Sequence, residues 1–349
     1  MPALHLLATA AVLAVLTVAH FAFWGWILRL PGREDELVRA PTRDGWTLAL
    51  GRRRPRGAPR LPPVLLVHGI AMNRGAFDFG LERWSLAAHL AAAGFDCFSL
   101  DLRGHGDSRR GPPSRWTLDT YLEEDLPAAL DAIRERTGSE AVLFVGHSQG
   151  ALLGMAACAL YPSRIRAVAA LAPPVHFRLQ PTVRALARLR RFGVGRHLRL
   201  IARIAAPFAG YWHPRIFELS VSLRNVEPRV YRRMLWNTIE GLPPGVVDQF
   251  ADWIRADAFR SADRAVDYRA LVRGCAQPAL FVSAGRDGLA PPAVVEEGFR
   301  DWSGPKRLLG CDGYGHTDLL LGRGAPEQVF GAIRDFLLEN SGAAPAPPG

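Results

Sequence analysis

The stretch "VGHSQG", residues 145–150, decides the fold of this chain. It ends the apolar run Ala141–Val145 and precedes Ala151–Leu160, a segment rich in the helix formers alanine and leucine. A strand, a sharp glycine turn and a helix, in this order, would present the Ser148 hydroxyl as a nucleophile. The turn excludes side chains at its two glycines, which would collide with the neighbouring strand and helix. The predicted turn consists of Gly146, His147, Ser148, Gln149 and Gly150.

Short apolar runs alternate with helix-like segments along the rest of the chain. Such runs are typical of parallel strands that are buried on both faces. The alternation predicts an α/β fold with a mostly parallel, doubly wound sheet. The expected strands are Thr47–Leu50, Val64–Val67, Phe95–Leu100, Ala141–Val145, Val168–Leu171 and Ala279–Ser283, and the expected helices include Leu81–Ala93 and Leu118–Arg136.

A serine hydroxyl needs a base to take its proton before it attacks. In this fold the expected chain order is serine, then an acid, then histidine. Asp287 follows an apolar strand in a glycine-flanked loop, and His316 lies in a loop ahead of the C-terminal helix. We therefore expect Asp287 to orient His316, and His316 to deprotonate Ser148.

Each partner also has a structural interpretation. A single aspartate in a glycine-rich loop is usually a turn former, and a single histidine is usually a hydrogen-bonded structural residue. Asp312 and Asp318 flank His316 and compete with Asp287 as its orienting acid. The conjunction of all three residue types in the required order favours catalysis.

The same chemistry needs donors for a developing oxyanion. The strand Val64–Val67 runs directly into His68-Gly69-Ile70-Ala71, where this fold supplies its second donor. We expect the backbone N–H groups of Ile70 and Gln149 to form the oxyanion hole.

Charge and cysteine content argue against several classes of function. The net charge is +10 and the cations are arginines apart from Lys306, yet no nucleic-acid-binding motif is present. The four cysteines, Cys97, Cys158, Cys275 and Cys311, lack the paired spacing that zinc or redox chemistry requires. We therefore expect no metal, no organic cofactor and no nucleic-acid partner.

Residues 3–28 carry no formal charge and are long enough to cross a bilayer as a helix. A cleaved signal peptide is the alternative, but a basic N-terminal region and a small-residue cleavage site are both missing. We therefore expect residues 1–30 to be a retained transmembrane anchor. Arginines follow this span and none precedes it, which predicts a catalytic domain on the cytoplasmic side of the membrane.

The strand–helix rhythm breaks over residues 176–273, and the first part of this insert is rich in arginine. We expect a helical cap here, a hydrolase core at 40–175 and 274–340, and a disordered tail at 341–349. The basic helices of the cap could lie on an anionic membrane surface or be ordinary solvated faces.

Several stretches resemble the acid-lipase group (gastric and lysosomal lipases) within the α/β-hydrolase superfamily. They are "TRDGWTLAL", "HGIAMNRGAFD", "GHSQGALLG", "LAPP" and "GHTDLLLGRGAPEQVFGAIRDFL". The resemblance covers roughly residues 40–340. It implies a triad of Ser148, Asp287 and His316, oxyanion donors at Ile70 and Gln149, and structural roles for Asp101 and His105. Acid lipases usually carry no permanent anchor, and their caps contain fewer arginines.

These patterns favour a membrane-anchored serine carboxylester hydrolase that cleaves apolar acyl or lipid esters. An acyltransferase or thioesterase with the same triad is the alternative. A non-catalytic protein that keeps the fold is a third possibility, which the full set of reactive residues disfavours.

Overall fold

A computed structural model describes residues 2–57, 61–112, 114–177, 194–211 and 215–342. The described residues form one eight-stranded sheet in the order β1-β2-β4-β3-β5-β6-β7-β8. The pairs β1–β2 and β2–β4 are antiparallel, and all the other pairs are parallel. The strands are β1 (Glu36–Pro41), β2 (Thr47–Arg53), β3 (Val64–Val67), β4 (Cys97–Asp101), β5 (Val142–His147), β6 (Ile165–Leu171), β7 (Ala279–Ala284) and β8 (Lys306–Cys311).

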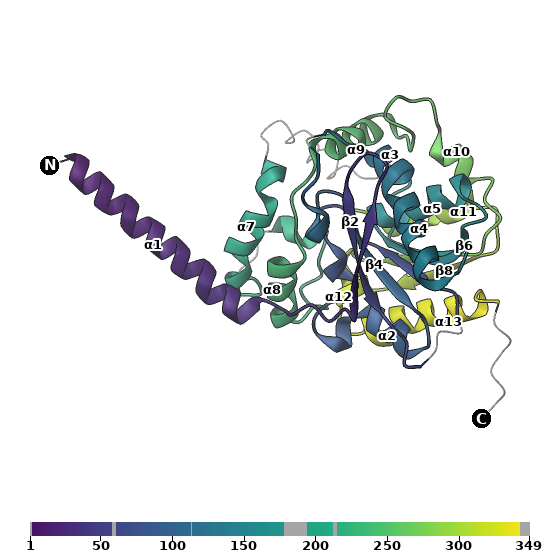
Figure 1. The fold of residues 1–349 in the computed structure, drawn as a ribbon, viewed down its shortest axis with the longest axis horizontal. Helices are drawn as coiled ribbons and strands as arrows, with labels where there is room; N and C mark the ends of the chain where they lie inside the picture. The colour runs from purple at the N-terminus through teal and green to yellow at the C-terminus, as the bar shows by residue number, and fades with distance from the viewer. Residues whose placement is uncertain (1, 58–60, 113, 178–193, 212–214, 343–349) are drawn as a thin grey trace.

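Helices cover both faces of this sheet, as the sequence pattern predicts (Figure 1). The central strands β3, β4 and β5 are buried along their whole length, because each face packs against helices. The helices in the described residues are α1 (Pro2–Leu28), α2 (Leu86–Ala92), α3 (Leu118–Thr120), α4 (Leu126–Thr137), α5 (Gln149–Leu160), α7 (Leu198–Ala205), α8 (Pro228–Asn237), α9 (Pro244–Ala256), α10 (Tyr268–Val272), α11 (Pro292–Asp301), α12 (Asp318–Leu321) and α13 (Gly331–Glu339).

Two predicted helices are interrupted. The predicted helix Leu81–Ala93 is a 3-10 turn followed by α2, because Ser85 leaves helical geometry and caps α2 by accepting from Ala88 N. The predicted helix Leu118–Arg136 contains a π-helical segment, Tyr121–Asp125, between α3 and α4. The helix predicted at Leu81–Ala93 therefore starts five residues too early, whereas the helical run from Leu118 to Thr137 matches the second prediction to within one residue.

The described part of the region between β6 and β7 contains the helices α7, α8, α9 and α10, joined by turns and coil. Residues 178–193 and 212–214 of the predicted cap lie outside the described residues. The predicted disordered tail begins too early, because Ser341 is buried and its carbonyl accepts from Arg166 at 3.3 Å. Residues 343–349 of that tail lie outside the described residues.

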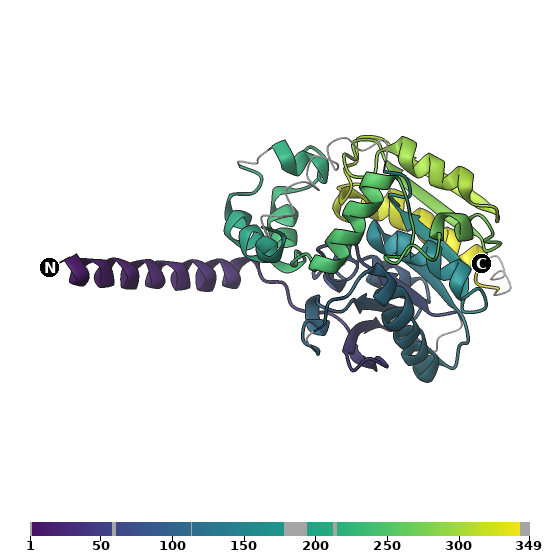
Figure 2. The same ribbon diagram turned by 90° about the horizontal axis from the view of Figure 1, so that it is seen from above.

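Helix α1 projects away from the sheet (Figures 1 and 2). Residues His5–Leu28 are long and apolar enough to cross a membrane, by length and composition, a test that signal sequences also pass. The end of α1 is nevertheless packed on the body, since Leu28 is buried and Asn237 of α8 holds Leu28 O at 2.9 Å and Leu30 N at 3.0 Å.

Candidate active site

Ser148 lies in the turn between β5 and α5, as predicted. Its backbone has φ 54° and ψ −117°, a conformation that non-glycine residues rarely adopt. The turn is held by hydrogen bonds from Ser148 N to Leu171 O at 2.8 Å and from Ala151 N to Ser148 O at 3.0 Å. Strain of this kind persists where the surrounding structure fixes it, and it concentrates at functional sites.

The two glycines of this turn are required by close backbone approach. A Cβ at Gly146 would collide with the carbonyl of Gly150, and a Cβ at Gly150 would collide with the carbonyl of Val67. The turn is therefore wedged between α5 and the end of β3, which fixes the position of Ser148.

His316 and Asp287 meet directly. His316 Nδ1 lies 2.6 Å from Asp287 Oδ2, and both side chains are buried. The other oxygen, Asp287 Oδ1, accepts from Leu289 N at 2.8 Å and Ala290 N at 2.7 Å. The carboxylate is thus held by its own loop and aimed at the imidazole, which is the geometry that fixes a tautomer with Nε2 as the free basic nitrogen.

Neither competing acid takes this place. Asp312 is exposed, and Asp318 accepts from Gly315 N at 2.9 Å and from Ser222 N at 3.1 Å instead. The structure thus pairs His316 with Asp287, the acid that the loop order favours.

His147 connects the loop of His316 to the serine turn. Its Nε2–H donates to His316 O at 3.0 Å, and the two imidazole rings are 4.6 Å apart between centroids. Burial, and then the neighbouring His316, lower the pKa of His147 to about 3, so this ring stays neutral. Ser148 Oγ itself makes no hydrogen bond within the described part of the chain. The structure therefore brings the loop of His316 to the serine turn through His147.

The predicted oxyanion donors lie beside the serine. A Cβ on Gly69 would be 3.2 Å from Ser148 Cβ, so the loop that carries Ile70 touches the serine turn. Among the described residues, neither Ile70 N nor Gln149 N donates a hydrogen bond to another group. Ala71 has a positive φ of 57°, and its carbonyl accepts from Glu240 N at 2.8 Å, which anchors this loop.

A segment between β6 and β7 covers the loops of Asp287 and His316. Gly288 N donates to Leu219 O at 3.0 Å, and Thr317 N donates to Ser220 O at 2.8 Å. Asp318 continues this contact, since it accepts from Ser222 N and from Asn225 Nδ2 at 3.2 Å. The loop of His316 is therefore fastened to the inserted region as well as to the sheet.

The role of Asp318 was not predicted from the sequence. Burial raises its pKa to about 6, although hydrogen bonds from Gly315, Ser222 and Asn225 oppose that rise. In the sequence, Asp318 was noticed only because it lies two residues from His316. That proximity suggested a pairing with His316, which the structure gives to Asp287 instead.

Asp101 and His105 are structural, as the sequence analysis expected. Asp101 is buried and accepts from Arg74 N at 2.8 Å and from Asp107 N at 2.9 Å. His105 Nδ1 lies 3.0 Å from Arg103 O, and burial lowers its pKa. Both residues therefore stabilise the loop after β4.

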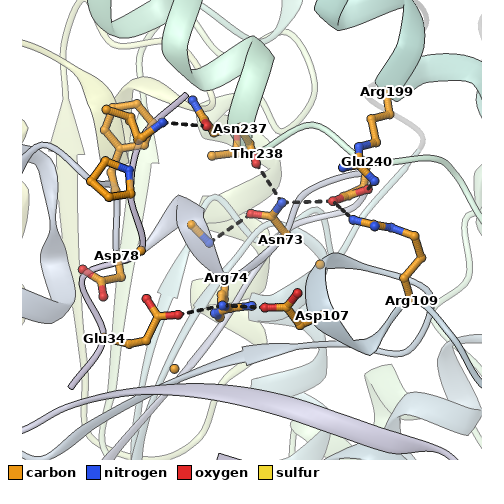
Figure 3. A pocket seen from close by; sticks show the side chains of 18 residues that line it. Glu34, Asn73, Arg74, Asp78, Asp107, Arg109, Arg199, Asn237, Thr238 and Glu240 are labelled. Atoms are coloured by element: carbon orange, nitrogen blue, oxygen red, sulfur yellow. Dashed lines mark hydrogen bonds and ion pairs between the residues drawn. The ribbon is translucent and has the colours of Figure 1, made fainter. Parts of the chain in front are cut away.

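A cavity of about 230 Å³ lies near the oxyanion loop, but Ser148, Asp287 and His316 do not line it (Figure 3). Seven of its 18 lining residues are charged: Glu34, Arg74, Asp78, Asp107, Arg109, Arg199 and Glu240. The buried Glu240 pairs with Arg109 at 3.1 Å and Arg199 at 3.4 Å, and it accepts from Asn73 at 3.1 Å. The polar residues that line this cavity come from the core, from α7 and from the segment after α1.

No cluster of three or more His, Cys, Asp or Glu side chains suited to a metal ion is found among the described residues. All four cysteines are buried and unpaired. Burial raises the pKa of both Cys275 and Cys311 to about 11, which keeps these thiols protonated.

A largely parallel sheet whose central strand ends in a strained serine turn, with an aspartate and a histidine on later loops, is the arrangement of an α/β hydrolase. The comparisons agree with this class. A family described as "alpha/beta hydrolase fold" matches residues 62–322. The chain belongs to the α/β-hydrolase fold family.

Individual relatives place the chain near the acid lipases. It is 34% identical over 167 residues to human gastric triacylglycerol lipase, a match that covers 43% of this chain and 40% of that lipase. It is 33% identical over 168 residues to human lysosomal acid lipase/cholesteryl ester hydrolase, covering 44% of this chain and 40% of the relative. The matched part thus spans less than half the length of these two relatives.

A thermophilic esterase from Thermogutta terrifontis has a similar solved structure, with a TM-score of 0.61 and 21% identity. The match covers 88% of this chain and 99% of the esterase. At this identity the likeness extends to the fold.

Proposed function

We propose that the protein is a serine carboxylester hydrolase that works through an acyl-enzyme on Ser148. The observation that carries the proposal is the 2.6 Å contact between His316 Nδ1 and Asp287 Oδ2, beside a serine in a strained turn. The required order of serine, acid and histidine along the chain supports the same assignment.

The mechanism has two steps. His316 Nε2 takes the Ser148 proton while Oγ attacks the ester carbonyl, and the protonated imidazole then donates that proton to the leaving alcohol. Asp287 stabilises the imidazolium, and its own two backbone hydrogen bonds keep it in place. Water deprotonated by His316 then attacks the acyl-enzyme and releases the acid, which regenerates Ser148.

Ile70 N and Gln149 N would bind the oxyanion of both tetrahedral intermediates. Their lack of other acceptors among the described residues supports this role, since each N–H is free to donate. Removing one such donor typically costs about 2.7–4 kcal/mol of transition-state stabilisation.

The proposed substrates are apolar acyl esters, with lipid esters foremost. The relatives are a triacylglycerol lipase and a cholesteryl ester hydrolase, which supports this class of substrate. The proposed division of the chain is a core at 40–175 and 274–340 under a helical cap at 176–273. Contacts of Leu219 and Ser220 with the catalytic loops support the cap.

A panel of p-nitrophenyl esters of increasing acyl length tests the activity. Ser148→Ala should abolish turnover and labelling by a fluorophosphonate probe. Ser99→Ala is the matched control, because Ser99 is also buried and its Oγ has no partner in the described residues. Unchanged hydrolysis in Ser148→Ala would exclude the proposal.

The second candidate function is that of an acyltransferase, which passes the acyl group to an alcohol, or of a thioesterase, which hydrolyses a thioester. Both use the same triad and form the same acyl-enzyme. Product analysis with an added alcohol or thiol acceptor separates the two. Predominant transfer in the presence of water would replace hydrolysis as the function.

We also propose that α1 is retained as a membrane anchor, with the body on the cytoplasmic side. The packing of Leu28 and the hydrogen bonds of Asn237 support retention. The arginines that follow α1 support the orientation. Intact-mass analysis of the membrane-extracted protein tests retention, and protease protection in sealed vesicles tests the side.

A further inference from the structure

Exposed apolar side chains gather on α7 and the turn that follows it. Leu200 is 48% exposed, Ile201 41%, Ile204 48% and Phe208 57%. Leu200 and Ile204 are four residues apart in α7 and so share one side, and Phe208 lies in the 3-10 turn that follows. Outside α1, the other large apolar residues of comparable exposure in the described chain, apart from Tyr211, are scattered at Leu37, Val266, Leu271, Leu308 and Leu338. We call Leu200, Ile201, Ile204 and Phe208 the α7 surface.

The α7 surface lies beside the end of the apolar helix α1. Both helices pack on Trp236 of α8: the Arg203 guanidinium sits 5.5 Å from its ring centroid, and Phe21 lies 6.1 Å from it between centroids. A Cβ on Gly25 would be 3.3 Å from the same indole. Figures 1 and 2 both show α7 next to the C-terminal end of α1.

This end of the molecule is strongly cationic. Helices α7 and α8 contain arginines and no aspartate or glutamate. Two carboxylates pair with arginines here: the buried Glu240 with Arg109 and Arg199, and Glu227, the residue before α8, with Arg229. Burial, and then the neighbouring Arg199, lower the pKa of Arg203. The arginines of the two helices are Arg199, Arg203, Arg229, Arg232 and Arg233.

The α7 surface lies close to several arginines and to a helix that could cross a bilayer. These features fit one partner, an anionic lipid bilayer. Amphipathic helices with basic flanks lie in the interface plane, with their apolar face among the acyl chains. Arginines close to the leaflet are attracted by anionic headgroups.

We propose that the α7 surface inserts into the interface of an anionic phospholipid bilayer, on the leaflet from which α1 emerges. This inference rests on the proposed anchoring by α1 and is independent of the ester chemistry. Since the segment after α7 also contacts the loops of Asp287 and His316, insertion holds the catalytic loops at the lipid surface.

The test places an environment-sensitive fluorophore on the α7 surface of the full-length protein. Ile204→Cys can be labelled selectively, because the native cysteines are buried. Leu308→Cys, on an exposed position of β8, is the matched control. Both are reconstituted into vesicles of phosphatidylcholine, alone or mixed with phosphatidylglycerol, with and without spin-labelled lipid.

At position 204 we expect a blue-shifted emission and quenching by spin-labelled lipid, both stronger when phosphatidylglycerol is present. At position 308 neither should occur. Equal signals at the two positions would overturn insertion, and quenching that ignores phosphatidylglycerol would overturn the role of the arginines. Because the readout is spectroscopic, these outcomes are separate from a failure of the proposed hydrolysis.

A second variant connects the surface to activity. Ile204→Glu should lower hydrolysis of a vesicle-embedded ester and leave hydrolysis of a water-soluble p-nitrophenyl ester unchanged. Leu308→Glu should change neither rate. Equal loss on both substrates would indicate a folding defect of the variant, and equal retention on both would contradict the proposal.

Discussion

At the scale of single residues, the candidate site depends on how each side chain is held. The Asp287 carboxylate contacts His316 with one oxygen and its own loop with the other. His147 is neutral and ties the His316 carbonyl to the serine turn. Hydrogen bonds from neighbouring residues thus orient Asp287 and His316. Conservative substitutions should therefore show whether a side chain acts by its position or by its own chemistry.

Asp287→Asn should keep the fold and lose activity. The amide is nearly isosteric, but its NH₂ or its single carbonyl cannot hold His316 with Nε2 unprotonated and also stabilise the imidazolium. In a serine triad such a change lowers kcat on the order of 10⁴-fold. Steady-state kinetics measure it, with Asp312→Asn, an exposed neighbour of the same loop, as the control. Equal losses in the two variants would point away from Asp287.

Asp318 should make the stability of the protein depend on pH. Its folded pKa of about 6 lies above the value of 3.8 for a free aspartate, so between these values the folded state keeps a proton that the unfolded state releases. The free energy of unfolding therefore falls as pH rises through this window, by roughly 2–3 kcal/mol in total. Asp318→Asn lacks this term.

Denaturant unfolding at a series of pH values measures the effect. The free energy of unfolding of the wild type, minus that of Asp318→Asn, should fall as pH rises from about 4 to about 6 and then stay level. Ser99→Ala, which removes no titrating group, should give a difference that is independent of pH. A level difference for Asp318→Asn across the window would contradict the raised pKa.

At the scale of secondary-structure elements, burial decided which features could be predicted. Val64–Val67 was predicted with the observed bounds because all four residues are buried and apolar. The strands β1 and β8 were missed, since exposed charged residues such as Arg39 and Arg307 interrupt their pattern. Ser85 broke a predicted helix because its capping bond to Ala88 outweighs the helical periodicity around it.

The residues of the candidate site could be predicted where their order along the chain matches the order that the fold requires. Ser148, Asp287 and His316 follow the order that the fold requires, and the structure pairs the last two. The contacts of Asp318 with Ser222 and Asn225 were not predictable, because they join segments far apart in sequence through a region without a recognisable pattern.

The serine turn gives a prediction at this scale. Gly150→Ala should destabilise the protein, because its Cβ meets the carbonyl of Val67 and the strand cannot move without disturbing the sheet. Overpacking of this kind costs about 1–3 kcal/mol. Gly331→Ala is the matched control, since no atom lies within 4 Å of its Cβ position. Thermal unfolding compares the two, and equal melting temperatures would show that the turn is not wedged.

At the scale of the whole molecule, the end of α1 is part of the folded body. Asn237 of α8 bridges Leu28 O and Leu30 N, and Trp236 packs against Phe21 and Gly25. The loops of Asp287 and His316, together with α7 and α8, therefore form one packed body with the end of α1. A cleavage within the span would remove packing from α8 as well as the apolar helix.

The junction can be tested by limited trypsin digestion at Arg29, which follows α1 and is exposed. Cleavage needs local opening of the Leu28–Leu30 segment, and two hydrogen bonds to Asn237 oppose that opening. Each bond contributes about 0.5–1.5 kcal/mol, so Asn237→Ala should speed cleavage after Arg29 by about fivefold or more. Asn340→Ala removes a bond to Phe336 O at the end of α13 and should leave this rate unchanged. Equal rates in the wild type and Asn237→Ala would mean that α1 and α8 are not coupled, and the proposed insertion of α7 would then lose its fixed relation to the proposed anchor.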